Sequence, residues 1–314
     1  MIDYVAKGRI LIIWVVMVAA VVFLGAVPFL PVSSAFIFYM MFWITMASSF
    51  NIIYGFTGYL PFGYVAFYGL GTYVTAVFWS RLGFPIPVAI LIAGGAGVLL
   101  SLIFAPTLRL RGIYFAIVNF SCAMALRILI ANLPEKWAGG SFGITLSAAY
   151  KPRFSYYCMF ILMIVTIFIV WKLSISRLGI ALRCIRDDYE AAEAMGIDVS
   201  MCRLKAWMLA ALIPSIAGGI EAWHTAIIDP DTSFSMMITT KSIVYAMFGG
   251  LGTITGPIVG TVFMYILDDL IWARFPILNL MVLGIFIVVL VLFFPRGIVG
   301  SITRWKPTLR AVLA

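Results

Sequence analysis

Long apolar runs constrain the fold of this chain more than any other feature of its sequence. They recur along almost its whole length. An α-helix needs about 20 residues to cross a bilayer, and many of the runs are close to this length. Hydrophobic residues make up 64% of the 314 residues and charged residues only 11%, whereas soluble domains carry roughly 25% charged residues. The sequence therefore predicts an all-α, polytopic membrane protein, with residues 1–314 forming a single transmembrane domain.

Ten candidate spans follow from the apolar runs, several of them short or interrupted. They cover residues 10–28, 34–53, 62–79, 86–105, 113–133, 155–172, 206–224, 237–250, 254–272 and 278–294. The first run is longer than the roughly 7–15 apolar residues of a signal peptide, so we expect a spanning helix there. Ten crossings place the N- and C-termini on the same side of the membrane.

The net charge is +9, and the distribution of the basic residues is explained by membrane topology. Of the 21 Lys and Arg residues, we assign 14 to segments on one side, and the positive-inside rule makes that side cytoplasmic. Nucleic-acid binding is not needed to explain the charge, so we expect no nucleic-acid partner. The four cysteines, Cys122, Cys158, Cys184 and Cys202, lack metal or disulfide spacing and are expected to pack as ordinary side chains.

One strongly charged stretch, residues 174–205, separates the sixth and seventh predicted spans on the cytoplasmic side. Within it, Asp187 is predicted to cap a short helix, and Glu190 to complete an acidic capping box. Gly196 is expected to end this helix in the left-handed conformation. Two turns of helix are marginal in water, so the helix needs a surface to pack against. A purely structural helix lying on the membrane is the alternative.

The pattern Glu190-Ala191-Ala192, followed after three residues by Gly196, resembles the first half of the EAA loop of ABC importer permeases. The second half of that motif is missing, and Ala206, Met208 and Leu209 stand in its place. The wider segment 176–196 resembles branched-chain amino-acid permeases of the ABC transporter family. This resemblance implies a set of ATPase-coupling residues: Arg183, Arg186, Asp187, Asp188, Glu190, Ala191, Ala192, Glu193, Met195 and Gly196.

Glycine-rich segments extend the resemblance over about residues 48 to 300. The glycines of residues 51–71 resemble an early signature of the family and favour a broken helix, with close helix packing as the alternative. Tyr59, Pro61 and Tyr64 stand where the family usually has Gln, Ser and His, which leaves the substrate open. Farther on, the spacing of Gly252, Gly256 and Gly260 predicts a stripe of small residues on one helix.

Polar residues inside apolar runs are candidates to line a pathway, because ionisable groups in a bilayer are costly and usually face the bundle interior. The candidates are Asn51, Gly58, Tyr64, Asn119, Ser121, Arg127 and Glu221. Asn119 and Arg127 lie eight residues apart and share a helix face. For each residue the alternative is a hydrogen bond between helices.

Catalytic equipment is not apparent in the sequence. The single histidine, His224, has no carboxylate pair or cysteine placed to work with it, and no phosphate-binding loop ends in Lys and Ser or Thr. We therefore expect no enzyme activity, catalytic residue, metal or cofactor in this chain. A secondary transporter driven by an ion gradient is an alternative, but the sequence shows no clear internal repeat of the kind common in such proteins.

The resemblance implies a membrane permease subunit of an ABC importer for branched-chain or related amino acids. The implied fold is the cobalamin-importer (type II) arrangement of about ten helices. The implied partners are two cytoplasmic ATPase subunits that bind ATP and Mg²⁺, a second, paralogous permease subunit, and a periplasmic substrate-binding protein. The implied location is the bacterial inner membrane, with both termini cytoplasmic. Similar permeases for urea or short amides leave a second substrate class open.

Overall fold

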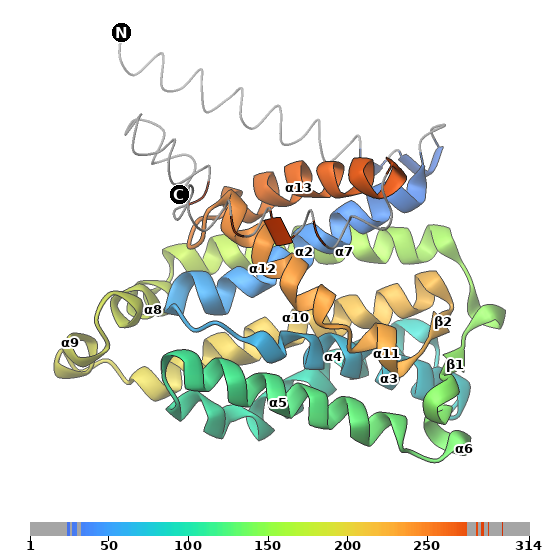
Figure 1. Ribbon diagram of the computed structural model, residues 1–314, viewed down its shortest axis with the longest axis horizontal. Coiled ribbons are helices and arrows are strands. Elements are labelled where there is room, and N and C mark those ends of the chain that lie inside the picture. Colours follow the sequence, from blue (N-terminus) through green and yellow to red (C-terminus); the bar gives the residue numbers. More distant parts are fainter. Residues whose placement is uncertain are drawn as a thin grey trace, which may run out of the picture.

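The computed structural model describes residues 33–274, together with Leu24, Gly25, Val27–Phe29, Met281, Gly284, Ile285, Val288 and Gly297. Most of the first predicted span and of the tenth lies outside these residues. The described chain is mostly helical, and its long helices lie alongside one another (Figure 1). Each of the eight predicted segments between residues 34 and 272 contains one long or medium helix.

Five described helices are long and apolar enough to cross a membrane. They are α2 (Ser34–Thr57), α4 (Ile86–Ile103), α5 (Gly112–Ala131), α7 (Pro152–Ile175) and α10 (Val199–Thr225). Three further helices are α3 (Val65–Ser80), α12 (Met236–Gly249) and α13 (Thr255–Arg274). The short helices are α6 (Glu135–Ala138), α8 (Arg177–Asp187), α9 (Tyr189–Ala194) and α11 (Pro230–Ser233). This architecture is that of a polytopic membrane protein.

Two short strands are the only β-structure in the part of the chain that the structure describes. Strand β1 (Ile144–Thr145) pairs antiparallel with β2 (Ile227–Ile228), and Ile144 lies opposite Ile228. The pair fastens the loop of residues 134–153 to the connection that follows α10. Both strands lie at the end of the molecule opposite α8 and α9 (Figure 1).

Helix α10 is the centre of the bundle and packs against α2, α3, α4 and α7. Small residues allow the close approach: a side chain at Gly71 of α3 or Gly97 of α4 would collide with Ser215 of α10. The Ser215 hydroxyl also donates to the Phe67 carbonyl oxygen, at 2.9 Å. Antiparallel packing of α10 on α2 is fixed by the Ser49 hydroxyl, which donates to the carbonyl oxygen of Ala210.

The segment of residues 51–71 contains a break between two helices. Helix α2 ends at Thr57 because Gly58 adopts a left-handed conformation, with φ of 76°, and α3 begins only at Val65. Freed backbone donors must find partners at such a break. The Gly63 amide donates to Asn119 Oδ1 of α5 at 2.8 Å, and the Val65 amide donates to Thr239 Oγ1 of α12 at 3.1 Å. The break is therefore built into the protein interior.

The predicted glycine stripe is right for two of its three members. Gly256 and Gly260 lie on α13, where an added side chain would collide with the backbone of residues 245–250. Gly252 was wrongly placed on this helix, because α13 begins at Thr255 and Gly252 lies in the preceding turn with φ of 76°. The turn needs this left-handed residue to bring α13 back against α12.

Candidate functional site

The charged segment forms a separate lobe at one end of the bundle, where α8 and α9 project beyond the long helices (Figure 1). Ser176 caps α8 by accepting a hydrogen bond from the Gly179 amide at 3.1 Å. Leu182 and Ile185 are buried on one face of α8, and Arg186, one turn after Leu182, reaches the bundle from beside that face. Asp187 is exposed on the opposite side of the helix. This division is that of an amphipathic helix lying on the bundle.

Helix α9 begins one residue later than predicted. Asp188 is its cap, and the Asp188 Oδ1 atom accepts from the amides of Glu190 at 2.9 Å and Ala191 at 3.0 Å. Asp187 is instead the last residue of α8, so its predicted capping role was wrong. The predicted capping box was also wrong, because Glu190 sits too early in the first turn, and its carboxylate lies 3.9 Å from Arg111 Nη1.

The end of α9 is as predicted. Gly196 has φ of 81°, its amide donates to the Glu193 carbonyl oxygen, and the Ile197 amide donates to the Ala192 carbonyl oxygen. These two bonds form a Schellman motif, which satisfies the last carbonyl groups of a helix and reverses the chain. Gly196 therefore fixes the direction in which the chain returns from α9 to α10.

Most of this lobe is open to contact by another protein. Ala192 is fully buried against the bundle, whereas Met195 at the tip is 68% exposed. The other exposed members of the predicted coupling set are Arg186, Asp187, Asp188, Glu190, Ala191, Glu193 and Gly196, while Arg183 is half-buried. An exposed tip with a large apolar side chain and flanking charges has the composition of a docking surface.

A hydrogen-bonded junction connects the lobe to two parts of the bundle. Arg186 Nη1 donates to the Gly55 carbonyl oxygen in the last turn of α2, at 2.7 Å. One turn earlier on α2, Asn51 Nδ2 donates to the Thr253 carbonyl oxygen at 2.9 Å, and Asn51 Oδ1 accepts from the Gly252 amide at 2.8 Å. The lobe, the end of α2 and the turn between α12 and α13 are thus joined by direct contacts.

A second junction surrounds Arg203, which is 4% exposed. Its guanidinium donates to the Tyr59 hydroxyl and to the Leu108 carbonyl oxygen, and lies 4.5 Å from the centre of the Tyr59 ring. The Arg111 guanidinium carbon lies 3.9 Å from the centre of the ring of Tyr189, the first residue of α9. Sequence reasoning missed this cluster. The one signal for it in the sequence was Tyr59, which stands where the family usually has Gln. An aromatic ring can bind a guanidinium group by a cation–π interaction.

A cavity of about 410 Å³ lies at the opposite end of the bundle from the lobe. Its lining residues come from α2, α3, α10, α11, α12 and strand β2: Tyr39, Phe42, Trp43, Tyr68, Glu221, Thr225, Ile227, Ile228, Asp229, Thr232, Ser233 and Ile238. Glu221 Oε2 accepts from the Tyr68 hydroxyl at 2.8 Å, and Oε1 from the Tyr39 hydroxyl at 3.5 Å. The cavity thus combines aromatic and aliphatic walls with a carboxylate.

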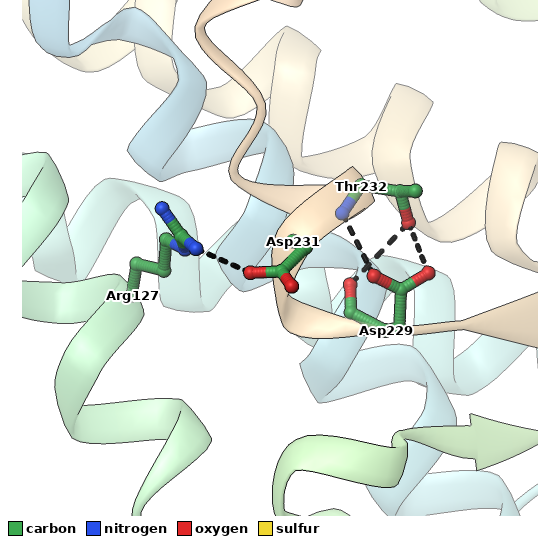
Figure 2. A network of polar contacts seen from close by, with 4 residues as sticks. All are labelled: Arg127, Asp229, Asp231 and Thr232. Atoms are coloured by element: carbon green, nitrogen blue, oxygen red, sulfur yellow. Dashed lines mark hydrogen bonds and ion pairs between the residues drawn. The ribbon is translucent and has the colours of Figure 1, made fainter.

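Figure 2 shows the polar network that fixes α11 at the edge of this cavity. Asp229 caps α11, accepting from the Thr232 amide at 2.8 Å and from the Thr232 hydroxyl at 2.6 Å. Asp231 forms an ion pair with Arg127 of α5. Arg127 thus joins α5 to α11 through Asp231, while Asp229 bonds to Thr232 within the connection after α10.

The remaining predicted pathway residues lie apart from one another. Asn119 is fully buried and accepts from the Gly63 amide; Tyr64 is fully buried, and its hydroxyl donates to the Met46 carbonyl oxygen at 3.1 Å. Ser121 is exposed and donates to the Ile117 carbonyl oxygen of its own helix. Gly58 ends α2 next to Arg186. The predicted set is thus distributed between the lobe junction, the helix break and the cavity.

A bundle that contains five helices long and apolar enough to cross a membrane is that of a multi-pass membrane protein. Residues 32–291 match the family described as branched-chain amino acid transport system / permease component, and the chain belongs to this family. It is a permease subunit of the ABC importer type. No solved structure matches the chain.

Curated relatives carry the same family description. The chain is 27% identical to the high-affinity branched-chain amino acid transport system permease protein LivM of Salmonella typhimurium, over 82% of this chain and 68% of the relative. It is 22% identical to the permease protein BraD of Pseudomonas aeruginosa, over 81% of this chain and 90% of the relative. A probable LivH permease of Methanocaldococcus jannaschii is 28% identical over 42% of each chain.

Proposed function

We propose that this chain forms part of the translocation pathway of an ABC importer for branched-chain aliphatic amino acids. The family match and the substrates printed in the relatives' names support this substrate class. The observation that carries the proposal is the junction at Arg186, which connects an exposed lobe to α2 and to the turn before α13. The junction gives a partner that pushes on α9 a direct mechanical route into the bundle.

In this proposal, ATP-driven closure of two ATPase subunits displaces α8 and α9. Because Arg186 is bonded to Gly55 and Asn51 to the turn at Gly252, the displacement moves α2 together with α12 and α13. Alternating access then corresponds to two packings of one bundle, each favoured by a different state of the ATPases. Close glycine contacts between α12 and α13 let these helices move as one unit.

The assembly follows from the same proposal. The chain forms a single ten-helix permease domain of the cobalamin-importer (type II) fold, in the bacterial inner membrane with both termini cytoplasmic. A paralogous permease subunit completes the pathway, and a periplasmic binding protein delivers the substrate. ATP and Mg²⁺ bind to the ATPase subunits, and this chain has no enzyme activity of its own.

Reconstitution tests the proposal. The complete transporter, with both permeases, the ATPase subunits and the binding protein, is placed in proteoliposomes, and uptake of radiolabelled leucine, isoleucine and valine is measured. We expect the labelled amino acids to accumulate only when ATP is present on the side of the membrane that carries the ATPase subunits. Uptake by this chain alone in response to an ion gradient would instead identify a secondary transporter. ATP-driven accumulation of urea or acetamide without leucine would assign the alternative substrate class.

A further inference from the structure

We propose that Glu221 binds the ammonium group of the transported amino acid inside the cavity between α2, α3 and α10. This inference rests on the proposed function and deepens it, since it assigns the chemical group that the permease itself recognises. The cavity of about 410 Å³ lies in the range of small-molecule sites, which start near roughly 300 Å³. Its volume therefore suits a single small solute.

Glu221 lies one turn before the end of α10 and has no cationic partner among the described residues. Within the described residues, its two oxygens accept hydrogen bonds from Tyr68 and Tyr39, the latter at a long 3.5 Å. A carboxylate inside a spanning helix is costly unless it is paired. Among the described residues, this carboxylate therefore remains available to pair with a positive charge from a ligand.

Three basic groups near the cavity have other partners among the described residues. Lys241 of α12 lies 2.6 Å from Asp268, and Arg127 of α5 pairs with Asp231. His224, one turn from Glu221, has its Nδ1 atom 2.9 Å from the Ser155 hydroxyl, and its ring is stacked on Phe38. None of these three groups pairs with Glu221, which leaves its carboxylate free to bind a cation from a ligand.

The rest of the lining fits the side chain of an aliphatic amino acid. Phe42, Trp43 and Ile238 offer apolar surface for a branched side chain. Tyr39 and Tyr68 hold the carboxylate in place by hydrogen bonds, which fixes where an ammonium group would sit. Asp229 adds a second negative charge at the rim, although its oxygens cap α11. The cavity lining thus places an anionic group for the ammonium beside apolar surface for the branched side chain.

The test uses the complete transporter in proteoliposomes with ATP and leucine-loaded binding protein. Glu221→Gln removes the charge and keeps the shape; we expect leucine uptake per ATP hydrolysed to fall at least tenfold, and Glu221→Asp to recover part of it. Glu135→Gln is the matched control, because Glu135 is exposed on α6 outside the cavity. Binding-protein-stimulated ATP hydrolysis reports whether each variant assembles.

A second pair of variants separates charge from bulk and does not require the loss of Glu221. Thr225 lines the cavity one turn along α10 from Glu221, so a lysine there can reach the carboxylate as a built-in ammonium group. We expect Thr225→Lys to lower leucine uptake at least tenfold and Thr225→Met, of similar length, to lower it much less.

The outcomes distinguish this inference from the proposed function. If the unmodified transporter shows no ATP-driven leucine uptake, the proposed function fails. If it does take up leucine, but Glu221→Gln matches Glu135→Gln or Thr225→Met blocks uptake as strongly as Thr225→Lys, the role of Glu221 is overturned while the proposed function stands.

Discussion

Arg186 Nη1 lies 2.7 Å from the carbonyl oxygen of Gly55, although the two residues are 131 positions apart in the sequence. The bond joins the exposed lobe of α8 and α9 to the last turn of α2. Most residues of α2 are buried in the bundle. A positive group beside the free carbonyl groups at a helix C-terminus is also favourable for the helix dipole. The contact therefore stabilises the C-terminal end of α2 and attaches the lobe to it.

Removing this contact should uncouple the transporter. In Arg186→Ala, ATP hydrolysis should continue while leucine uptake per ATP falls roughly tenfold, since a hydrogen bond to a charged group contributes about 1.5 kcal/mol or more. Arg177→Ala is the control, because Arg177 is exposed at the start of the same helix and forms no hydrogen bond or ion pair with the described residues. Equal coupling in the two variants would remove Arg186 from the proposed route.

Gly196→Val should disrupt the return from α9. A β-branched residue at φ of 81° is strained by roughly 1–2 kcal/mol, so the Schellman motif should open and uptake per ATP should fall several-fold. Gly83→Val carries a matched strain, because Gly83 has φ of 69°, is exposed and likewise has open space around it. If Gly83→Val impairs coupling as much as Gly196→Val does, backbone strain alone explains the effect.

Asn51→Leu should destabilise the protein by about 1–3 kcal/mol, because it leaves the Gly252 amide and the Thr253 carbonyl group without their partner. Thermal unfolding in detergent should show a clearly lower midpoint for this variant. Ser121→Ala should leave the midpoint nearly unchanged, since the Ser121 side chain is exposed and bonds only within its own helix. An unchanged midpoint for Asn51→Leu would show that the turn holds without it.

The Lys241–Asp268 and Arg127–Asp231 ion pairs should contribute very differently to stability. Lys241 and Asp268 have side chains only 17% and 11% exposed, so Asp268→Ala leaves a nearly buried ammonium group and should cost about 3–5 kcal/mol. The Arg127 and Asp231 side chains are 42% and 80% exposed, so Asp231→Ala should cost under about 1 kcal/mol. Comparable losses of thermal stability in the two variants would contradict this ranking.

Local signals in the sequence were enough to place the eight long or medium helices between residues 34 and 274 and the end of α9. Gly196 was predictable because a helix end needs a left-handed residue, and few residues other than glycine adopt one easily. The start of α9 was less certain because Asp187 and Asp188 are both capping residues, and the choice between them depends on where α8 ends.

Long-range partners could not be read from the sequence. Glu221 was recognisable as a charged residue in an apolar run, but its partners Tyr39 and Tyr68 lie 182 and 153 positions away on other helices. The bonds of Asn51 to the turn at Gly252 likewise depend on how α12 and α13 pack, which tertiary structure alone determines. Periodicity locates a polar residue, whereas its contacts depend on the whole bundle.

Cross-linking from the lobe tests the central claim most directly, because the account depends on α9 touching the ATPase. A photoreactive amino acid is placed at Met195, which is 68% exposed on the lobe, and in a matched variant at Phe142, which is 89% exposed at the other end of the molecule. Illumination of membranes containing the assembled transporter should join position 195, and not position 142, to an ATPase subunit. A cross-link to the ATPase from position 142, or none from position 195 in an assembled and active transporter, would contradict the account.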